Sequence, residues 1–446
     1  MATTSPSFES RADGAARSNP AMVALVVFLF FAWGFVTNLN DPLIAKFKGL
    51  FSLDYAEAML TQFAFFLGYL IFSIPAGILL SRTGYIRTIV TGLVLMAVGY
   101  LLFAPAAMAG LYWGFLIALF VTAAGITILQ VAANPYIAVL GPQSTASARL
   151  TLAQAFNSLA TTIGPFVGAL YLLRGGVAAP KAANAASLQA ARIAETKDLL
   201  GLFLGIAGVL IFFAVLFWLL RKTREPSTAS SDTPLSARVL KKKRLMLGVV
   251  AIFLYVGAEV SIGSGMTNYL MQDSVLGLRA AGIGQWVSGM IGGGPYNVAQ
   301  VAGAMVSVYW GLAMVGRFLG SFVLSKVVPG RVVVFNGLGA ILLCLLSAAT
   351  MGLPAAVAVM FVGLMNSIMF PTIFTIALED LGEETANGSA LLCTAIVGGA
   401  VVPVIYGAVA DRIGLGHALI VPALCYIYIA AYGWLAARGL GQMKAA

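Results

Sequence analysis

Residues 221–244, RKTREPSTASSDTPLSARVLKKKR, decide the fold, because this hydrophilic and basic stretch interrupts a chain that is otherwise largely apolar. Of the 446 residues, 60% are hydrophobic and only 9% are charged, and the mean hydropathy is +0.96. A soluble domain carries about 25% charged residues. With so few charges the chain cannot cover a water-exposed surface, so most of its surface must face lipid.

Apolar runs long enough to span a bilayer lie on both sides of the basic stretch, six before it and six after it. A transmembrane helix needs about 20 apolar residues. The runs that meet this length lie at 21–45, 58–80, 87–108, 111–140, 149–173 and 199–221, and then at 245–271, 297–325, 331–351, 354–378, 387–410 and 415–437. We therefore predict an all-α membrane protein with 12 transmembrane helices.

This layout divides the chain into two six-helix halves, at 21–221 and 245–438, joined by a basic linker at 222–244. Residues 1–20 are polar and lack the features of a cleavable signal peptide, so we expect a disordered cytoplasmic tail there. We expect a second cytoplasmic tail at 439–446.

The 26 Lys and Arg residues orient the predicted helices. Most of them fall on one side of the membrane if both termini and the central linker lie on that side, as the positive-inside rule requires. The net charge of +10 therefore reflects topology, and we expect lipid contacts and no nucleic-acid partner. We predict a multi-pass protein of a bacterial inner membrane, monomeric, with both termini in the cytoplasm.

Two short turns repeat at equivalent places in the halves. GILLSRTGYIR (77–87) follows the second predicted helix, and GSFVLSKVVPGR (320–331) follows the eighth. Each contains glycines and two cations. Parallel six-helix halves with such turns are the layout of the major facilitator superfamily, whose sites lie between the halves.

Two carboxylates, Asp41 and Glu259, lie well inside the predicted spans, whereas the other acidic residues fall in tails, loops or helix ends. A charge at the bilayer centre costs at least ~2.5–3.5 kcal/mol on insertion scales. Such a group is tolerated when it binds a cation, pairs with a donor or faces a wet cavity. We predict that Asp41 and Glu259 line a transport pathway; the alternative is a carboxylate satisfied inside a packed bundle.

Amide side chains pair at helical spacing on three helices of the first half. The pairs are Asn38 with Asp41, Gln130 with Asn134, and Gln154 with Asn157. A spacing of three or four residues places each pair on one helix face. Such pairs can hold helices together, but three of them in one half favour a shared cavity. Amides both donate and accept hydrogen bonds, which suits a ligand rich in hydroxyl groups.

The second half offers further polar positions. Glu259 lies in YVGAEVSIGS (255–264), whose small residues allow close packing, and Asn268 follows on the same predicted helix. Asn366 lies in the middle of another span, where Pro371 predicts a kink. We include Asn268 and Asn366 among the expected sugar-binding residues.

Six stretches resemble the fucose/galactose/glucose branch of the major facilitator superfamily over about residues 25–437. They are NLND (38–41), QVAANPYIAVLGP (130–142), RLTLAQAFNSLATTIGP (149–165), YVGAEVSIGS (255–264), MNSIMFPTIF (365–374) and IVGGAVVPVIYGAVAD (396–411). Within this branch the chain is most similar to the Gram-negative glucose/galactose transporters. The resemblance implies the major facilitator fold and cation-coupled sugar transport.

The resemblance also implies roles for particular residues. Asp41 matches the aspartate implicated in proton coupling, and Gln154 and Asn157 match positions that line the sugar cavity. The chain departs from the fucose symporters at Gln130, where they carry a glutamate, and at Glu259, where they carry a glutamine. The resemblance thus implies that a carboxylate has moved from the fourth helix to the seventh, where Glu259 serves as a sugar ligand or a second coupling group.

We therefore expect a cation-coupled hexose importer for glucose- or galactose-type sugars, working by alternating access. The coupling ion, H⁺ or Na⁺, is left open, and no other cofactor is expected. Three widely spaced cysteines and a single histidine fit no metal site, so we assign no metal ligands.

Two alternatives carry their own expectations. A proton-driven multidrug exporter of the same fold requires a mainly aromatic and apolar cavity, which the clustered amides argue against. A membrane-embedded enzyme such as a glycosyltransferase requires an interfacial carboxylate cluster, and the acidic residues at 379–384 are the one candidate. We expect these to form a solvated cytoplasmic turn, so no catalytic residue is assigned.

Overall fold

A computed structural model of the chain describes residues 20–140, 146–178, 184–220, 239–277, 282, 285, 296–324, 326–379, 381 and 385–438. These residues form helices joined by short connections, and no strand occurs among them. The predicted tails and most of the predicted linker lie outside them.

The helices fall into two consecutive sets. The first set is α1 (Pro20–Asn38), α2 (Asn40–Phe51), α3 (Tyr55–Thr83), α4 (Tyr85–Ala109), α5 (Tyr112–Val139), α6 (Ala146–Leu172) and α7 (Ala185–Leu219). The second set is η3 (Val239–Lys241), α8 (Lys243–Leu270), α10 (Val298–Leu324), α11 (Pro329–Ala349), α12 (Gly352–Asn366), α13 (Met369–Leu378), α14 (Thr385–Thr394), η5 (Ala395–Val397), α15 (Gly398–Ile413), α16 (Leu415–Ala418) and α17 (Ile420–Ala437).

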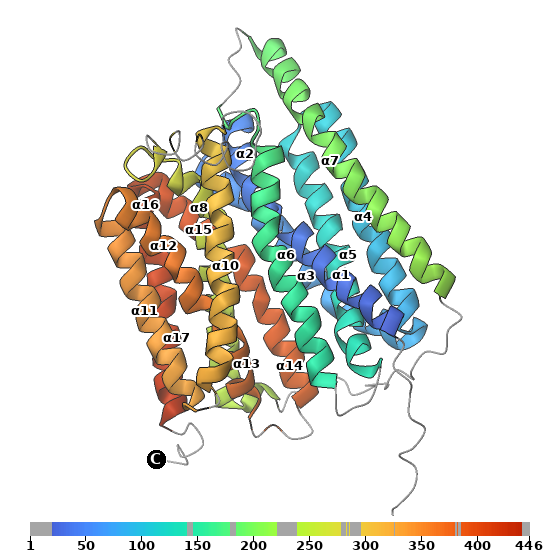
Figure 1. Ribbon diagram of the computed structural model, residues 1–446, viewed down its shortest axis with the longest axis vertical. Coiled ribbons are helices and arrows are strands. Elements are labelled where there is room, and N and C mark those ends of the chain that lie inside the picture. The colour runs from blue at the N-terminus through green and yellow to red at the C-terminus, as the bar shows by residue number, and fades with distance from the viewer. Residues whose placement is uncertain are drawn as a thin grey trace, which may run out of the picture.

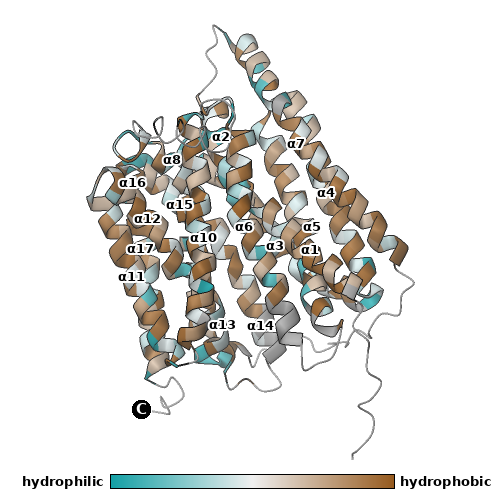
Figure 2. Ribbon diagram, in the orientation of Figure 1, coloured by the Kyte–Doolittle hydropathy of each residue, from teal (hydrophilic) through white to brown (hydrophobic). Residues whose placement is uncertain are grey.

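Twelve segments of the described chain are long and apolar enough to cross a membrane, which confirms the predicted count. Large apolar side chains are exposed on the outer surfaces of these segments. Ile74 is 68% exposed, Phe335 68% and Leu342 66%. Hydrophobic colour covers most of the helix lengths (Figure 2). In water such a surface would aggregate, so it belongs in lipid.

Each set of helices builds its own core, and the two halves stand side by side (Figure 1). The first core comes from α1 to α7. The second comes from α8 to α17, together with Ile44, Ala58 and Met59 of the first half. Helix α6 packs against α10, α3 packs against α15, and α2 contacts α8, so these pairs form the main contacts between the halves.

Several predicted spans are interrupted or extended. The first, tenth and eleventh spans are broken into α1–α2, α12–α13 and α14–η5–α15. The sixth apolar span begins at Leu199 as predicted, but the helix that contains it, α7, already begins at Ala185. Residues 185–198 are polar, so a hydropathy criterion leaves them out, but they are rich in alanine and begin with a capping box between Asn184 and Ser187.

Polar contacts join the halves at the upper end of the bundle in Figure 1, opposite the end where α17 finishes. The Asp411 carboxylate of α15 accepts hydrogen bonds from the main-chain N–H groups of Tyr55 (2.7 Å) and Ala56 (2.9 Å) at the start of α3. Asn297, just before α10, donates to the main-chain oxygens of Leu173 (2.8 Å) and Arg174 (3.0 Å) at the end of α6. Both contacts match a side chain of one half with a helix end of the other, where main-chain groups lack helical partners.

Candidate functional site

The first span breaks at Leu39, between α1 and α2. Pro42 has no N–H group and cannot donate to the main-chain oxygen of Asn38 one turn earlier. The side-chain amide of Asn38 donates to the main-chain oxygen of Gly34, one helical turn earlier (3.1 Å). The break places Asp41 in the first turn of α2.

Asp41 is buried at the junction of the two halves, with 4% of its surface exposed. Its Oδ1 atom accepts a hydrogen bond from Ser264 Oγ of α8 (3.1 Å). Its Oδ2 atom accepts one from the indole Nε1 of Trp310 in α10 (3.1 Å). Gln62 of α3 donates to the same Ser264 hydroxyl (2.7 Å). A carboxylate of the first half is therefore held by two donors from the second.

Glu259, the second predicted carboxylate, lies on α8 one helical turn before Gly263, and Asp41 Oδ2 lies 3.8 Å from where a Cβ of Gly263 would be. Glu259 therefore lies one turn of α8 away from the position that Asp41 of α2 faces. Glu259 is half-buried. Its Oε1 accepts a hydrogen bond from Tyr255 Oη (2.7 Å), and the same hydroxyl lies 2.9 Å from the main-chain oxygen of Asn366.

Asn366 ends α12 and is fully buried within the second half. Its Nδ2 donates to Tyr309 Oη (2.8 Å) and its Oδ1 accepts from Tyr426 Oη (2.8 Å). Tyr309 in turn donates to the main-chain oxygen of Glu259 (3.3 Å). The amide therefore joins three helices around Glu259, and direct sugar contact by Asn366 stays a prediction.

Pro371 breaks the tenth span as predicted, and the main-chain oxygen that the break leaves without a helical donor is bound by an arginine of α10. Because proline lacks an N–H group, the main-chain oxygen of Ser367 loses its helical donor. The Arg317 Nε atom of α10 donates to this oxygen (3.2 Å), and Arg317 Nη1 donates to Ser158 Oγ of α6 (2.6 Å). Arg317 thus joins the broken helix of the second half to a helix of the first.

The first-half amides have different surroundings. Gln130 Nε2 donates to Tyr69 Oη (3.2 Å). Asn157 Nδ2 donates to the main-chain oxygen of Phe30 (2.9 Å), which links α6 to α1. Gln154, one turn earlier on α6, is exposed. Asn157 is therefore part of helix packing, whereas sugar contact by the exposed Gln154 stays a prediction.

Two of the predicted residues carry a buried polar atom that has no protein partner. These atoms are Asn134 Oδ1 on α5 and Asn268 Nδ2 on α8. An unmade hydrogen bond at a buried polar atom costs about 1–3 kcal/mol. Both atoms are therefore suited to a ligand or to water, in keeping with the polar pathway that was predicted.

Three residues of this arrangement are missed by the sequence analysis: Gln62, Trp310 and Arg317. Each is a polar side chain inside an apolar span that donates a hydrogen bond. Trp310 and Arg317 also lie two turns apart on one face of α10. Trp310 is missed because tryptophan is common in apolar spans, and Arg317 because the sequence places it near a helix end.

The acidic turn proposed as an enzyme alternative is described only in part. Glu379 forms an ion pair with Arg244 at the start of α8; Asp380, Glu383 and Glu384 lie outside the described residues. The contact fits the expected solvated turn. Among the residues described, no group of three or more His, Cys, Asp or Glu side chains could hold a metal ion.

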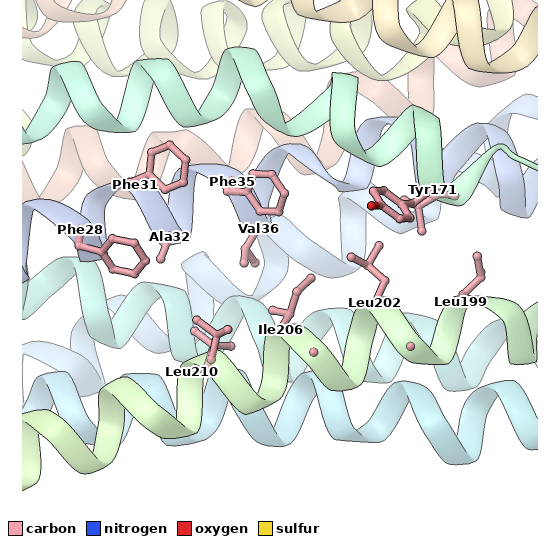
Figure 3. A pocket seen from close by; sticks show the side chains of 14 residues that line it. Phe28, Phe31, Ala32, Phe35, Val36, Tyr171, Leu199, Leu202, Ile206 and Leu210 are labelled. Atoms are coloured by element: carbon pink, nitrogen blue, oxygen red, sulfur yellow. The ribbon is translucent and has the colours of Figure 1, made fainter. Parts of the chain in front are cut away.

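A cavity of about 630 Å³ opens between α1, α6 and α7, away from these polar groups (Figure 3). Its walls are formed by apolar side chains such as Phe28, Phe35 and Leu202, with Tyr171 at one end. None of its lining residues is a carboxylate or an amide. This groove does not suit a sugar, and the polar set around Asp41 and Glu259 remains the candidate site.

The sequence profile described as Major Facilitator Superfamily matches residues 22–403. The chain is 44% identical over 417 residues to the glucose/galactose transporter of Brucella abortus biovar 1, a match that covers 93% of each protein. It is 33% identical over 428 residues to the L-fucose-proton symporter of Escherichia coli K12, again covering 93% of each.

A solved structure of the E. coli fucose:proton symporter superposes with a TM-score of 0.65 at 31% sequence identity. The superposition covers 94% of this chain and 99% of that one.

Proposed function

This chain belongs to the Major Facilitator Superfamily, and from that premise we propose that it imports a hexose of the glucose/galactose type by cation symport. Membership of a family of transporters sets aside the enzyme alternative. The relatives carry names of sugar transporters and sugar-proton symporters, and they align over nearly their full length.

The observation that carries the proposal is the position of Asp41. A buried carboxylate lies where both halves meet, its two oxygens held by Ser264 and Trp310 of the opposite half. Among the described residues no ion pair includes it. A carboxylate without a fixed counter-ion can exchange a cation when the halves move.

The sugar would lie among polar groups of both halves, next to this carboxylate. Gln154 is exposed, and Gln130 and Glu259 are half-buried. The partnerless atoms of Asn134 and Asn268 add an acceptor and a donor. Amides and carboxylates that face a common space can satisfy the hydroxyl groups of a pyranose. We assign Asn38 and Asn157 to shaping this region, since both donate to main-chain oxygens of α1.

The coupling ion is H⁺ or Na⁺. A single buried carboxylate is sufficient for H⁺, because protonation removes its charge. Sodium ions take oxygen ligands, which the carboxylates of Asp41 and Glu259 could supply together.

Orientation follows from the basic residues. We propose that the end at which α1 begins and α17 finishes faces the cytoplasm, because the basic linker lies next to the start of α8 at that end. The end closed by Asp411 and Asn297 then faces the periplasm of a bacterial inner membrane. This conformation would be one of the two required for alternating access, with the site closed toward the outside.

Uptake of labelled glucose and galactose into proteoliposomes tests the proposal, with an inward H⁺ or Na⁺ gradient imposed separately. We expect accumulation above equilibrium with one of the two gradients. In the Asp41→Asn variant accumulation should be lost, whereas exchange of labelled for unlabelled sugar should continue, because exchange needs no net release of the cation.

Two results would contradict the proposal. Full concentrative uptake by Asp41→Asn would remove Asp41 from coupling. Export of lipophilic cations with no hexose uptake would instead favour the multidrug exporter.

A further inference from the structure

The donors around Asp41 impose a condition on its protonation state. The indole N–H of Trp310 can only donate. Ser264 has a single proton, and its oxygen already accepts from Gln62 Nε2 (2.7 Å). The Ser264 proton is therefore free to point at Asp41 Oδ1 (3.1 Å). When Asp41 is ionised, both of its oxygens therefore accept a hydrogen bond from the second half, one from Ser264 and one from Trp310.

A cation on Asp41 would disrupt this pattern. A proton on Oδ2 would face the Trp310 N–H, which cannot accept it, and a proton on Oδ1 would require the Ser264 hydroxyl to turn away and to accept from both Asp41 and Gln62. A bound Na⁺ would meet the same two hydrogens. Hydrogen bonds to an ionised acceptor are also about twice as strong as neutral ones. The donors and the cation thus compete for the same oxygens.

The close approach depends on the main chain of α8. A side chain at Gly263 would place its Cβ 3.2 Å from the Trp310 ring and 3.8 Å from Asp41 Oδ2. Because glycine stands there, Trp310 and Asp41 can meet across α8. Ser264 follows directly and is 1% exposed. These donors belong to α8 and α10, so they reach Asp41 only while the second half lies against α2.

Other charged groups near this cluster have separate partners. Lys46, on the same helix as Asp41, pairs with Glu195 (2.7 Å). Arg317 of α10 donates to Ser158 and to Ser367. Glu259 of α8 accepts from Tyr255. Among the described groups, Trp310, Ser264 and, through Ser264, Gln62 are the polar side chains that contact Asp41.

We propose that Trp310 and Ser264 are positioning residues that expel the coupling cation from Asp41 when the outer end of the transporter closes. The inference rests on the proposed role of Asp41 in coupling. Closure supplies two donors that stabilise the cation-free carboxylate, and the cation is released toward the open side. By linkage, a cation bound to Asp41 disfavours the closed contact to the same degree.

The test uses Trp310→Phe, which keeps a ring and removes the N–H donor, and Ser264→Ala, which removes the hydroxyl. Proteoliposomes are preloaded with increasing concentrations of the coupling cation, and net uptake and sugar exchange are measured. Both variants should keep exchange within about twofold of the unaltered protein. The internal cation concentration that halves net uptake should fall about tenfold, because the cation is released less readily.

Trp113→Phe is the matched control, since it makes the same chemical change at a tryptophan that is 67% exposed, far along the chain from Asp41. This variant should leave unaltered the internal cation concentration that halves net uptake. Ser264→Thr, which restores a hydroxyl, should recover much of the dependence that Ser264→Ala loses. If one variant does not fold, judged by monodispersity in detergent, the other decides the question.

Unaltered cation dependence in folded Trp310→Phe and Ser264→Ala overturns the inference. Parallel loss of exchange and net uptake in folded protein also overturns it, because that result marks a sugar-binding or structural role. Failure of this inference can be distinguished from failure of the proposed function. If Asp41→Asn accumulates sugar, the coupling assignment fails; if it exchanges without accumulating while both donor variants behave as unaltered protein, only this inference fails.

Discussion

Asn157 and Gln154 share one face of α6, yet their surroundings differ. Asn157 donates to the main-chain oxygen of Phe30 and lies against Gly34, where a Cβ would overlap its side chain. Asn157→Ala should therefore lower stability by about 0.5–1.5 kcal/mol, the usual net contribution of one such hydrogen bond. Thermal unfolding in detergent checks this. An unchanged melting temperature would contradict the packing role.

Gln154→Ala should act on binding and not on stability. Gln154 is exposed, so its removal leaves no buried group unpaired in the sugar-free protein. If its amide contacts the sugar, affinity should fall by about 1–3 kcal/mol because a polar partner is left unmade in the complex. Calorimetric titration with glucose and galactose measures the change, and Asn157→Ala serves as the comparison. Unchanged affinity would remove Gln154 from the site.

Glu259 has two possible roles that one variant separates. If Glu259 only binds sugar, Glu259→Gln should weaken uptake equally at every pH and Na⁺ concentration. If it exchanges the coupling cation, the same change should flatten the dependence on that cation. Initial hexose uptake on a grid of pH and Na⁺ distinguishes the cases, with Asp41→Asn alongside. Unaltered behaviour over the whole grid would leave Glu259 with a structural role.

At the residue scale, the sequence shows which residues can carry chemistry, but it does not show which residues they contact. Asp41 and Glu259 stand out because few charges lie inside the spans. Their donors cannot be found this way, because Ser264 and Trp310 belong to helices of the other half, far along the chain. Spacing along one helix also cannot tell that Asn157 turns to α1 while Gln154 stays exposed. The packing of helices that are distant in the sequence determines both the donors of Asp41 and the different surroundings of Asn157 and Gln154.

At the scale of elements, two broken helices lie at the candidate site. Pro42 and Pro371 each free a main-chain oxygen, and the breaks bring Asp41 and Asn366 to the interior. Discontinuous spans are common at transporter binding sites, since irregular main chain in a membrane must line a cavity or find partners. Pro371 signals its break in the sequence. The break at η5 is less visible in the sequence, because no proline lies within it; the main chain of α8 approaches it closely at Gly398.

That approach predicts the effect of adding a methyl group. A Cβ at Gly398 would overlap the main-chain oxygen of Phe253 in α8, and a main chain inside a helix cannot move aside. Gly398→Ala should therefore lower the stability by about 1–3 kcal/mol, as overpacking does. Gly208→Ala is the control, because no atom lies within 4 Å of its Cβ position. It should gain up to about 1 kcal/mol from helix propensity.

Thermal unfolding of both glycine variants in one detergent decides between them. A similar melting temperature for Gly398→Ala and Gly208→Ala would show that α8 and α15 are not in close contact.

At the scale of the whole molecule, the two halves are predictable and their relative placement is not. Hydropathy and the basic linker divide the chain into two sets of spans, and the cores follow that division. Which end of the bundle is closed depends on contacts such as Asp411 with the start of α3. We expect these contacts to differ between the two conformations that the proposed alternating access requires.

Asp411 provides a test of that closure with an internal control. The start of α3 is held by two carboxylates: Asp54 of the same helix accepts from the Glu57 N–H (2.7 Å), and Asp411 of α15 accepts from Tyr55 and Ala56. Replacing either aspartate by alanine removes a helix cap, at a cost of about 0.5–2 kcal/mol. Only Asp411→Ala also removes a link between the halves.

Asp411→Ala should therefore open the closed end, whereas Asp54→Ala should not. A cysteine introduced at Ala299, which is buried between α6 and α10 near that end, reports on opening through its rate of reaction with a maleimide after the three native cysteines are replaced. Because a change of one or two kcal/mol alters a conformational ratio about 5–30-fold, labelling should accelerate by that order in Asp411→Ala. Equal labelling rates in the two aspartate variants would mean that loss of a helix cap alone explains the effect, and that the halves are held together elsewhere.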